Sequence, residues 1–233
     1  MARVPRGLVL LEGLSFHKVW RGHNREPNLG TSDEKWVYLS LLNEEQKKQS
    51  SSLHAICLMT NHAHEVYTLG TQADFSAFMR RHHARYGQFF NKKHKRCGKV
   101  AQDRPHTSAI QNDEYEMIVI FYIHANPVRA GIVNDAKKYV WSTHNLYAFG
   151  KRAEWMKNIQ FPIWYLNLGK TMKERQKKYR ELFDAYLKEQ GLRKQTFSFY
   201  GIGNLSWRRE RRTEILAFTR SRARALAPPL QAT

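Results

Sequence analysis

Cysteine is scarce in this chain: only Cys57 and Cys97 occur among its 233 residues. Two isolated cysteines make neither a zinc-ligand pattern nor the disulfide framework of a small secreted domain, and they suit a reducing compartment. Long apolar runs are also missing. The run at residues 8–11 is too short for the core of a signal peptide, and no run approaches the roughly 20 residues of a membrane-spanning helix. We therefore expect a cytoplasmic protein without a membrane partner.

Acidic residues are few as well. The chain has 20 Asp and Glu against 39 Lys and Arg, which gives a formal net charge of +19 and a pI of about 10.1. Such an excess of positive charge raises the local concentration of polyanions and speeds their encounter with the protein. Nucleic acid is the natural partner, because each neutralised phosphate releases a condensed counterion. A basic but inert surface is the alternative, since membranes and ribosomes also attract basic proteins.

Hydrophobic periodicity and turn residues predict an α+β fold, in which helices pack on an antiparallel sheet. The first 20 residues read as an extended apolar segment, and a helix is expected over 33–49. Two strands are expected at 53–59 and 62–69, because these short runs flank the turn-prone residues 60–61.

A further helix is expected over 74–90, followed by a basic loop over 91–104. The next helix is expected to begin at residue 112. It should stop near Ala125, because the residue before Pro127 is biased away from the helical conformation.

The character of the chain changes after residue 150, where basic residues become frequent. Helices are expected near 171–190 and 206–226. We therefore divide the chain into a first domain over 1–150 and a basic helical C-terminal region over 151–233, which we expect to contact DNA.

The first segment with chemical potential is the pair His62 and His64. Residues two apart in a strand face the same side of a sheet, so both imidazoles should project together. Neutral imidazoles side by side are a ready metal-binding pair. The alternative is that both are ordinary polar residues of a strand.

The second segment begins at Tyr122 and reads YIHANPVRAG. Positions four apart share one face of a helix, so Tyr122 and Asn126 should point to one place. They would set a phenol beside an amide oxygen able to complete a metal site. The alternative makes Tyr122 a core aromatic and the Asn126-Pro127 pair a simple helix stop.

Taken together, these segments resemble the REP-associated tyrosine transposases, a group of single-tyrosine HUH transposases. The run from Leu58 to His64 (LMTNHAH) is similar to their HUH strand, with Thr60 in place of the usual proline. The segment from Tyr122 is similar to their nucleophile helix. The resemblance spans about residues 16–147. Two further matching motifs occur in the expected order: Gly98-Lys99-Val100 followed by Asp103-Arg104, and Tyr139-Val140-Trp141-Ser142.

The resemblance implies a ferredoxin-like sheet, the HUH endonuclease fold, with helices on one side. It implies an enzyme that cleaves and rejoins single-stranded DNA near hairpins, with a divalent ion (Mg²⁺ or Mn²⁺) and no nucleotide cofactor. His62 and His64 would be metal ligands and Tyr122 the nucleophile that forms a 5′-phosphotyrosine. Asn126 would be the third ligand, where many relatives in the wider group have glutamine.

Other interpretations remain open at this point. Tyr115, two helical turns before Tyr122, is a rival nucleophile, although it lacks the Asn126 partner. The chain could instead be a non-catalytic nucleic-acid binder, or a metal-dependent nuclease that uses water. Relaxases and rolling-circle initiators share the HUH motif, but they are usually longer. Monomer and homodimer are equally compatible with the sequence, as are a mobile-element transposase and a domesticated one.

Basic residues interleaved with aromatics suit a single-stranded DNA track, because the cations follow the backbone while the rings stack on bases. If DNA is the partner, the protein should associate with the nucleoid. The expected DNA contacts are Arg80, Arg81, Arg85, Lys92, Lys93, Lys95, Arg96, Arg104, Arg129, Arg208, Arg209, Arg211 and Arg212.

Overall fold

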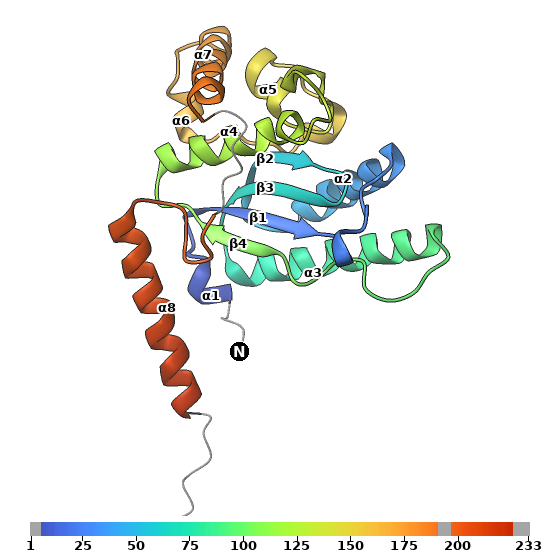
Figure 1. Ribbon diagram of the computed structural model, residues 1–233, viewed down its shortest axis with the longest axis vertical. Helices are drawn as coiled ribbons and strands as arrows, with labels where there is room; N and C mark the ends of the chain where they lie inside the picture. The colour runs from blue at the N-terminus through green and yellow to red at the C-terminus, as the bar shows by residue number, and fades with distance from the viewer. Residues whose placement is uncertain (1–5, 191–196, 226–233) are drawn as a thin grey trace, which may run out of the picture.

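The computed structural model describes residues 6–190 and 197–225, and it contains one four-stranded antiparallel sheet within them (Figure 1). The strands are β1 (Ser15–Arg21), β2 (Ser52–Leu58), β3 (His62–Thr68) and β4 (His106–Ala109). Their order is β2-β3-β1-β4, which is the ferredoxin-like arrangement expected from the sequence. β3, with the histidine pair, is therefore a central strand.

Helices cover both faces of this sheet, so the expectation of helices on one side was wrong. Helices α2 (Ser32–Gln46) and α3 (Gln72–Lys93) pack on one face, with side chains from alternate strand positions. Helix α4 (Asp113–Arg129) packs on the other face through a second, separate core. The reason is visible in the strands: nearly every residue of β2 and β3 is buried, and a strand buried on both sides needs cover on both sides.

A buried ion pair joins the two central strands on the α2–α3 face. Lys18 Nζ of β1 lies 2.7 Å from Glu65 Oε2 of β3, and both side chains are fully buried. The hydroxyls of Tyr38 and Tyr67 donate to the same carboxylate at 2.5 and 2.6 Å. Since a buried charge is tolerated only when it is paired and hydrogen-bonded, this cluster favours one register of β1 on β3.

Helix α4 continues past the predicted stop at Ala125 and ends at Arg129, with Pro127 inside it. Asn112 caps its start, where its side chain accepts from the Tyr115 N–H. Pro127 lies in the last turn, so the ring removes a single helical hydrogen bond. The end is secured instead by the Ile132 N–H, which donates to the Pro127 carbonyl at 2.9 Å.

The chain after α4 forms short elements and two long helices. The predicted helices near 171–190 and 206–226 are present as α7 (Met172–Gln190) and α8 (Leu205–Ala225); the predicted end at residue 226 lies outside the described residues. The expected extended start of the chain contains a short helix, α1 (Arg6–Val9), before β1. The remaining short elements are η1 (His23–Arg25), η2 (Ala136–Lys138), α5 (His144–Phe149), η3 (Glu154–Met156) and α6 (Ile163–Leu166).

The core under α4 crosses the predicted boundary at residue 150. The Phe121 ring of α4 packs edge-on against two rings of α7. Its centre lies 5.4 Å from that of Tyr179 and 5.7 Å from that of Phe183. His124 of α4 shares hydrogen bonds with the Tyr179 hydroxyl and with Thr143. The two sequence regions therefore contribute to one hydrophobic core in this part of the molecule.

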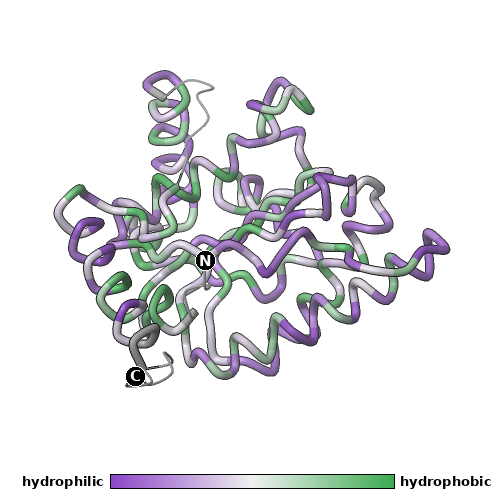
Figure 2. The backbone as a smooth tube through the Cα atoms, turned by 60° about the horizontal axis from the view of Figure 1, so that its bottom comes forward, coloured by the Kyte–Doolittle hydropathy of each residue, from purple (hydrophilic) through white to green (hydrophobic). Residues whose placement is uncertain are grey.

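Hydrophobic and hydrophilic residues alternate along the helices (Figure 2), as expected for helices that bury one side only. Helix α8 extends away from the sheet in Figure 1. Within the described residues, no helix is both long enough and apolar enough to cross a membrane.

Candidate active site

His62 and His64 project from the same face of β3, with ring centres 4.8 Å apart. Each ring is oriented through its Nδ1 atom. His62 Nδ1 lies 2.6 Å from Asn61 Oδ1, and because an amide oxygen only accepts, the proton of this bond is on the histidine. The lone pair of the neutral His62 ring is then on Nε2, the arrangement in which a histidine binds a metal.

His17 of β1 orients His64, a role that no local pattern in the sequence indicates. His17 Nε2 lies 2.9 Å from His64 Nδ1, and the two rings stack with centres 5.1 Å apart. Burial lowers the pKa of His17 to about 3 and the pKa of His64 well below its usual value. Both rings are therefore neutral at pH 7, as metal binding requires. Only the pairing of β1 with β3, which is not a local pattern, brings them together.

Tyr122 of α4 lies next to His64, on the face of the sheet that α4 covers. Its ring centre lies 5.9 Å from His64 and 6.5 Å from His17, edge-on in both cases. The side chain is 7% exposed. Burial raises the pKa of the Tyr122 phenol, while the positive charges of Arg129 and Arg21 oppose the rise. The Tyr122 ring therefore lies beside the rings of His64 and His17.

Asn126 lies one helical turn after Tyr122, at the buried end of α4. Its Oδ1 accepts from Arg129 Nη1 at 2.8 Å, and its buried Nδ2 has no hydrogen-bond partner within the described structure. An amide oxygen has two lone pairs, so Asn126 Oδ1 can accept from Arg129 and still bind a cation.

Arg129 holds the end of α4 together around Tyr122. The same Nη1 atom donates to the Tyr122 carbonyl at 2.8 Å, and Nη2 donates to the Tyr186 hydroxyl of α7 at 3.0 Å. The guanidinium carbon lies 4.5 Å from the centre of the Tyr122 ring. These contacts fit a role in positioning the phenol better than a role as an exposed DNA contact.

Tyr115 is in the first turn of α4 and packs against the second core. Seven residues correspond to a rise of about 10 Å along a helix, so Tyr115 lies well away from the Tyr122 position. The residue that covers Tyr122 is Phe197, which was not predicted from the sequence. Its ring packs edge-on with centres 4.8 Å from Tyr122 and 5.3 Å from His17.

The open edge of the site lies at the end of β1. Arg21 is exposed, and it pairs in register with His62 on the neighbouring strand. Burial raises the pKa of Tyr122, and the charge of Arg21 opposes this rise. Burial lowers the pKa of His64 and of His106 on β4, and the charge of Arg21 adds to both falls. Arg21 is thus a cation beside the histidine pair, and no sequence motif predicted it.

The donor atoms fit a divalent cation. The structure holds the imidazoles of His62 and His64, whose Nδ1 atoms are engaged, together with the amide oxygen of Asn126. Within the described residues, no group of three or more His, Cys, Asp or Glu side chains has the arrangement of a metal site. A cation here would therefore have few protein ligands, and positions would be left for water and for phosphate oxygens.

Several of the expected DNA contacts are paired with acids in the structure. Arg81 and Arg85 contact Glu45, Lys93 contacts Asp33, and Arg96 contacts Glu26. Arg80, Lys92, Lys95 and Arg104 lie on the exposed side of α3 or in the loop after it.

The arginines of α8 differ among themselves. Arg211 is 7% exposed, and its Nη2 donates to the Leu8 carbonyl, which makes it a structural contact to α1. Arg208 is half-buried, whereas Arg209 and Arg212 are exposed. Of the four predicted contacts in α8, Arg209 and Arg212 are therefore the ones exposed to solvent.

The chain belongs to the IS200-like transposase family. The model of this family (Transposase IS200 like) matches residues 11–126. The matched range includes His62, His64, Tyr122 and Asn126. No curated protein matches the sequence.

A solved structure described as a REP-associated tyrosine transposase bound to a REP hairpin superimposes with a TM-score of 0.53. The sequences are 21% identical, and the match covers 66% of this chain and 89% of the other. The resemblance stated from the sequence is thereby confirmed at the level of family and fold.

Proposed function

We propose that this protein cleaves and rejoins single-stranded DNA next to a hairpin, through a covalent bond between Tyr122 and a DNA phosphate. The observation that carries the proposal is the position of the Tyr122 ring, 5.9 Å from His64 on the sheet face that also bears His62. Membership of a transposase family supports a DNA-processing role.

In the proposed reaction the Tyr122 oxygen attacks phosphorus and the bond from phosphorus to the 3′ oxygen breaks. The products are a 5′-phosphotyrosine and a free 3′-hydroxyl, which gains the proton that the phenol loses. The reverse attack by a 3′-hydroxyl rejoins DNA without a nucleotide cofactor, because the covalent link retains the phosphodiester energy.

Each neighbouring residue has a separate role in this proposal. Arg129 holds the phenol and the Asn126 amide in place, and Arg21 attracts the phosphate to the open edge of the site. His62, His64 and Asn126 would hold Mg²⁺ or Mn²⁺. Such an ion would supply charge stabilisation at a phosphate oxygen.

The proposed DNA partner carries a hairpin, because the similar solved structure is described as bound to one. The exposed Arg209 and Arg212 of α8 are proposed to contact its phosphates. Replacement of both by alanine should weaken hairpin binding and reduce its salt dependence by about one or two phosphate contacts. The control is Lys188→Ala, which removes the charge of an exposed lysine on α7.

The test of the proposed function is a covalent adduct. The full chain is incubated with labelled, hairpin-bearing single strands and Mg²⁺ or Mn²⁺, and adducts that resist SDS are separated. We expect an adduct from the native protein and from Tyr115→Phe, and none from Tyr122→Phe. An adduct that survives Tyr122→Phe, or cleavage without any adduct, would refute the proposal and favour a nuclease that uses water.

The alternative is a non-catalytic nucleic-acid-binding protein. It predicts hairpin binding without cleavage under any of these conditions. The charge of +19 is equally compatible with it, so the adduct assay separates the two.

A further inference from the structure

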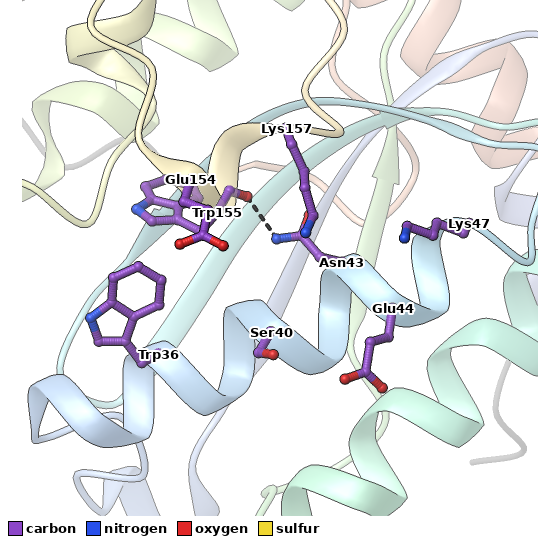
Figure 3. Close-up of a pocket in the computed structure, with 8 residues that line it drawn as sticks. All are labelled: Trp36, Ser40, Asn43, Glu44, Lys47, Glu154, Trp155 and Lys157. Atoms are coloured by element: carbon purple, nitrogen blue, oxygen red, sulfur yellow. Dashed lines mark hydrogen bonds between the residues drawn. The ribbon is translucent and has the colours of Figure 1, made fainter.

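A groove along α2 lies outside the candidate site (Figure 3). Two acidic and two basic side chains line it: Glu44, Glu154, Lys47 and Lys157. Because these charges balance, the groove favours neither an anion nor a cation. The polar contacts that bear on the proposed chemistry lie elsewhere, on the side of α4 that faces away from Tyr122.

His124 of α4 is the centre of a buried hydrogen-bond network. Its side chain is fully buried, and both ring nitrogens are engaged. Nδ1 lies 2.6 Å from the Tyr179 hydroxyl of α7, and Nε2 lies 2.7 Å from Thr143 Oγ1. Burial lowers the pKa of His124 well below its usual value, so the ring is neutral with one N–H. Since a hydroxyl can donate or accept, both bonds are made whichever nitrogen carries the proton.

Thr143 extends this network to the sheet. Its Oγ1 accepts from the Ile56 N–H of β2 at 3.1 Å, and the Thr143 N–H donates to the Ile56 carbonyl at 3.0 Å. His124 is thus tied to β2 on one side and to α7 on the other. In Figure 1, α4 lies between the sheet and α7. One rigid ring therefore connects these three parts of the structure.

The rotation of α4 about its own axis decides where Tyr122 points. His124 follows Tyr122 by two residues, which is about 200° around an α-helix, so the two side chains leave α4 on nearly opposite sides. At the outer radius of a helix, about 6 Å, a rotation of about 10° moves a side-chain atom by about 1 Å. A displacement of about 1 Å at a reacting group can slow a reaction roughly a hundredfold. The two bonds of His124 resist this rotation.

A second contact between α7 and α4 supports the same orientation. Tyr186 follows Tyr179 by seven residues, so the two hydroxyls lie on one face of α7. The Tyr186 hydroxyl accepts from Arg129 Nη2 at 3.0 Å, and the Arg129 guanidinium lies over the Tyr122 ring. Helix α7 thus holds α4 at two points, His124 and Arg129, both within about two turns of Tyr122.

We infer that His124 is a positioning residue for the proposed reaction. Its bonds to Tyr179 and Thr143 fix the rotation of α4 that directs Tyr122 toward the histidine pair. This role rests on the proposed function, in which Tyr122 is the nucleophile. It gives α7, in the C-terminal region, a part in the chemical step as well as in the hydrophobic core.

The test removes one hydroxyl at a time from the full-length protein. Tyr179→Phe keeps the ring that packs on Phe121 and Phe183 and removes only the bond to His124. With saturating hairpin DNA and Mn²⁺, the rate of adduct formation should fall roughly tenfold to a hundredfold, while hairpin affinity stays unchanged. Thr143→Val should slow the reaction in the same way. Thr143→Ser, which keeps the hydroxyl, should retain most of the native rate.

The matched control is Tyr165→Phe. It removes a buried hydroxyl from the same core, one that donates to the Tyr147 carbonyl at 2.7 Å. Urea unfolding should show a similar loss of stability in Tyr165→Phe and Tyr179→Phe, but Tyr165→Phe should keep the native rate. Equal rates in the two variants would overturn the positioning role and leave the network a purely structural one.

A measurement that needs no catalysis follows the Tyr122 ring itself. The protein is labelled with fluorotyrosine, and the fluorine NMR resonance of Tyr122 is identified by its absence in Tyr122→Phe. We expect this resonance to shift or broaden in Tyr179→Phe and to stay in place in Tyr165→Phe. An unmoved resonance in Tyr179→Phe would overturn the positioning role. A shifted resonance, without any adduct from the native protein, would refute only the cleavage proposal.

Discussion

The guanidinium carbon of Arg129 lies 4.5 Å from the centre of the Tyr122 ring, and its Nη1 donates to the carbonyl of the same tyrosine at 2.8 Å. One residue thus contacts both the backbone and the ring of the proposed nucleophile. Arg129 also donates to Asn126 Oδ1. The guanidinium group of Arg129 therefore orients both the Tyr122 phenol and the Asn126 amide.

Arg129→Lys is the first prediction. Lysine keeps the charge but loses the planar fork that reaches three acceptors at once. We expect adduct formation at saturating DNA to slow by roughly tenfold to a hundredfold, because a small displacement of a reacting group has effects of this size. Hairpin affinity should change little. The opposite pattern, with weaker binding and an unchanged rate, would identify Arg129 as a DNA contact.

His17→Ala is the second prediction. Without His17, Nδ1 of His64 loses the partner that fixes its ring and its tautomer. We expect the Mn²⁺ concentration needed for half-maximal adduct formation to rise by about tenfold to a hundredfold, with the rate largely restored at saturating metal. His94→Ala is the control, because His94 lies on the α3 side and pairs with Glu34. An unchanged metal requirement in His17→Ala would contradict the orienting role.

Phe197→Ala is the third prediction. The Phe197 ring lies edge-on against both Tyr122 and His17, so it covers part of the proposed nucleophile. Removal of the ring should raise the rate of adduct formation a few-fold at subsaturating DNA. The control is Phe199→Ala, since Phe199 packs on His106 instead. A lower rate in Phe197→Ala would mean that the ring supports Tyr122 and does not obstruct it.

Glu116→Gln is the fourth prediction and concerns stability. Burial raises the pKa of Glu116 from near 4.5 to about 7, and a hydrogen bond to Ser15 opposes the rise only in part. The folded protein keeps this proton between about pH 4.5 and pH 7, while the unfolded chain releases it. The contribution of Glu116 to the free energy of unfolding is therefore full at pH 4.5 and is lost as the pH rises through 7.

Glutamine imitates the protonated acid, so Glu116→Gln should stabilise the protein at pH 8, by up to about 3 kcal/mol, and have little effect at pH 4.5. Urea unfolding at the two pH values measures this difference. Glu114→Gln, an exposed neighbour on the same helix, should show no such pH dependence. Equal effects of Glu116→Gln at both pH values would contradict the assignment.

The sequence predicted those parts of the site that depend on local periodicity. His62 and His64 share a sheet face because strands repeat every two residues, and Tyr122 and Asn126 share a helix face because helices repeat every 3.6. His17 and Phe197 could not be found in this way. Their contacts arise from strand pairing and from the return of the chain after α7, neither of which leaves a local pattern.

The errors in the fold have similar causes. β4 has only four residues, His106–Ala109, and such a short strand carries too little alternation to be read from sequence. The stop predicted at Ala125 gave the proline rule too much weight, because at the end of a helix one missing N–H costs little. Helices on both faces follow from the burial of β2 and β3 on both sides, which depends on tertiary packing.

The aromatic contacts between α4 and α7 have a practical consequence for anyone who shortens or recombines this protein. A chain cut at residue 150 would expose Phe121 and its neighbours to solvent, so a shortened protein has to keep α7 intact. The same holds for exchange between relatives: the tyrosine-bearing helix and α7 are complementary surfaces, so they have to be transplanted as one unit.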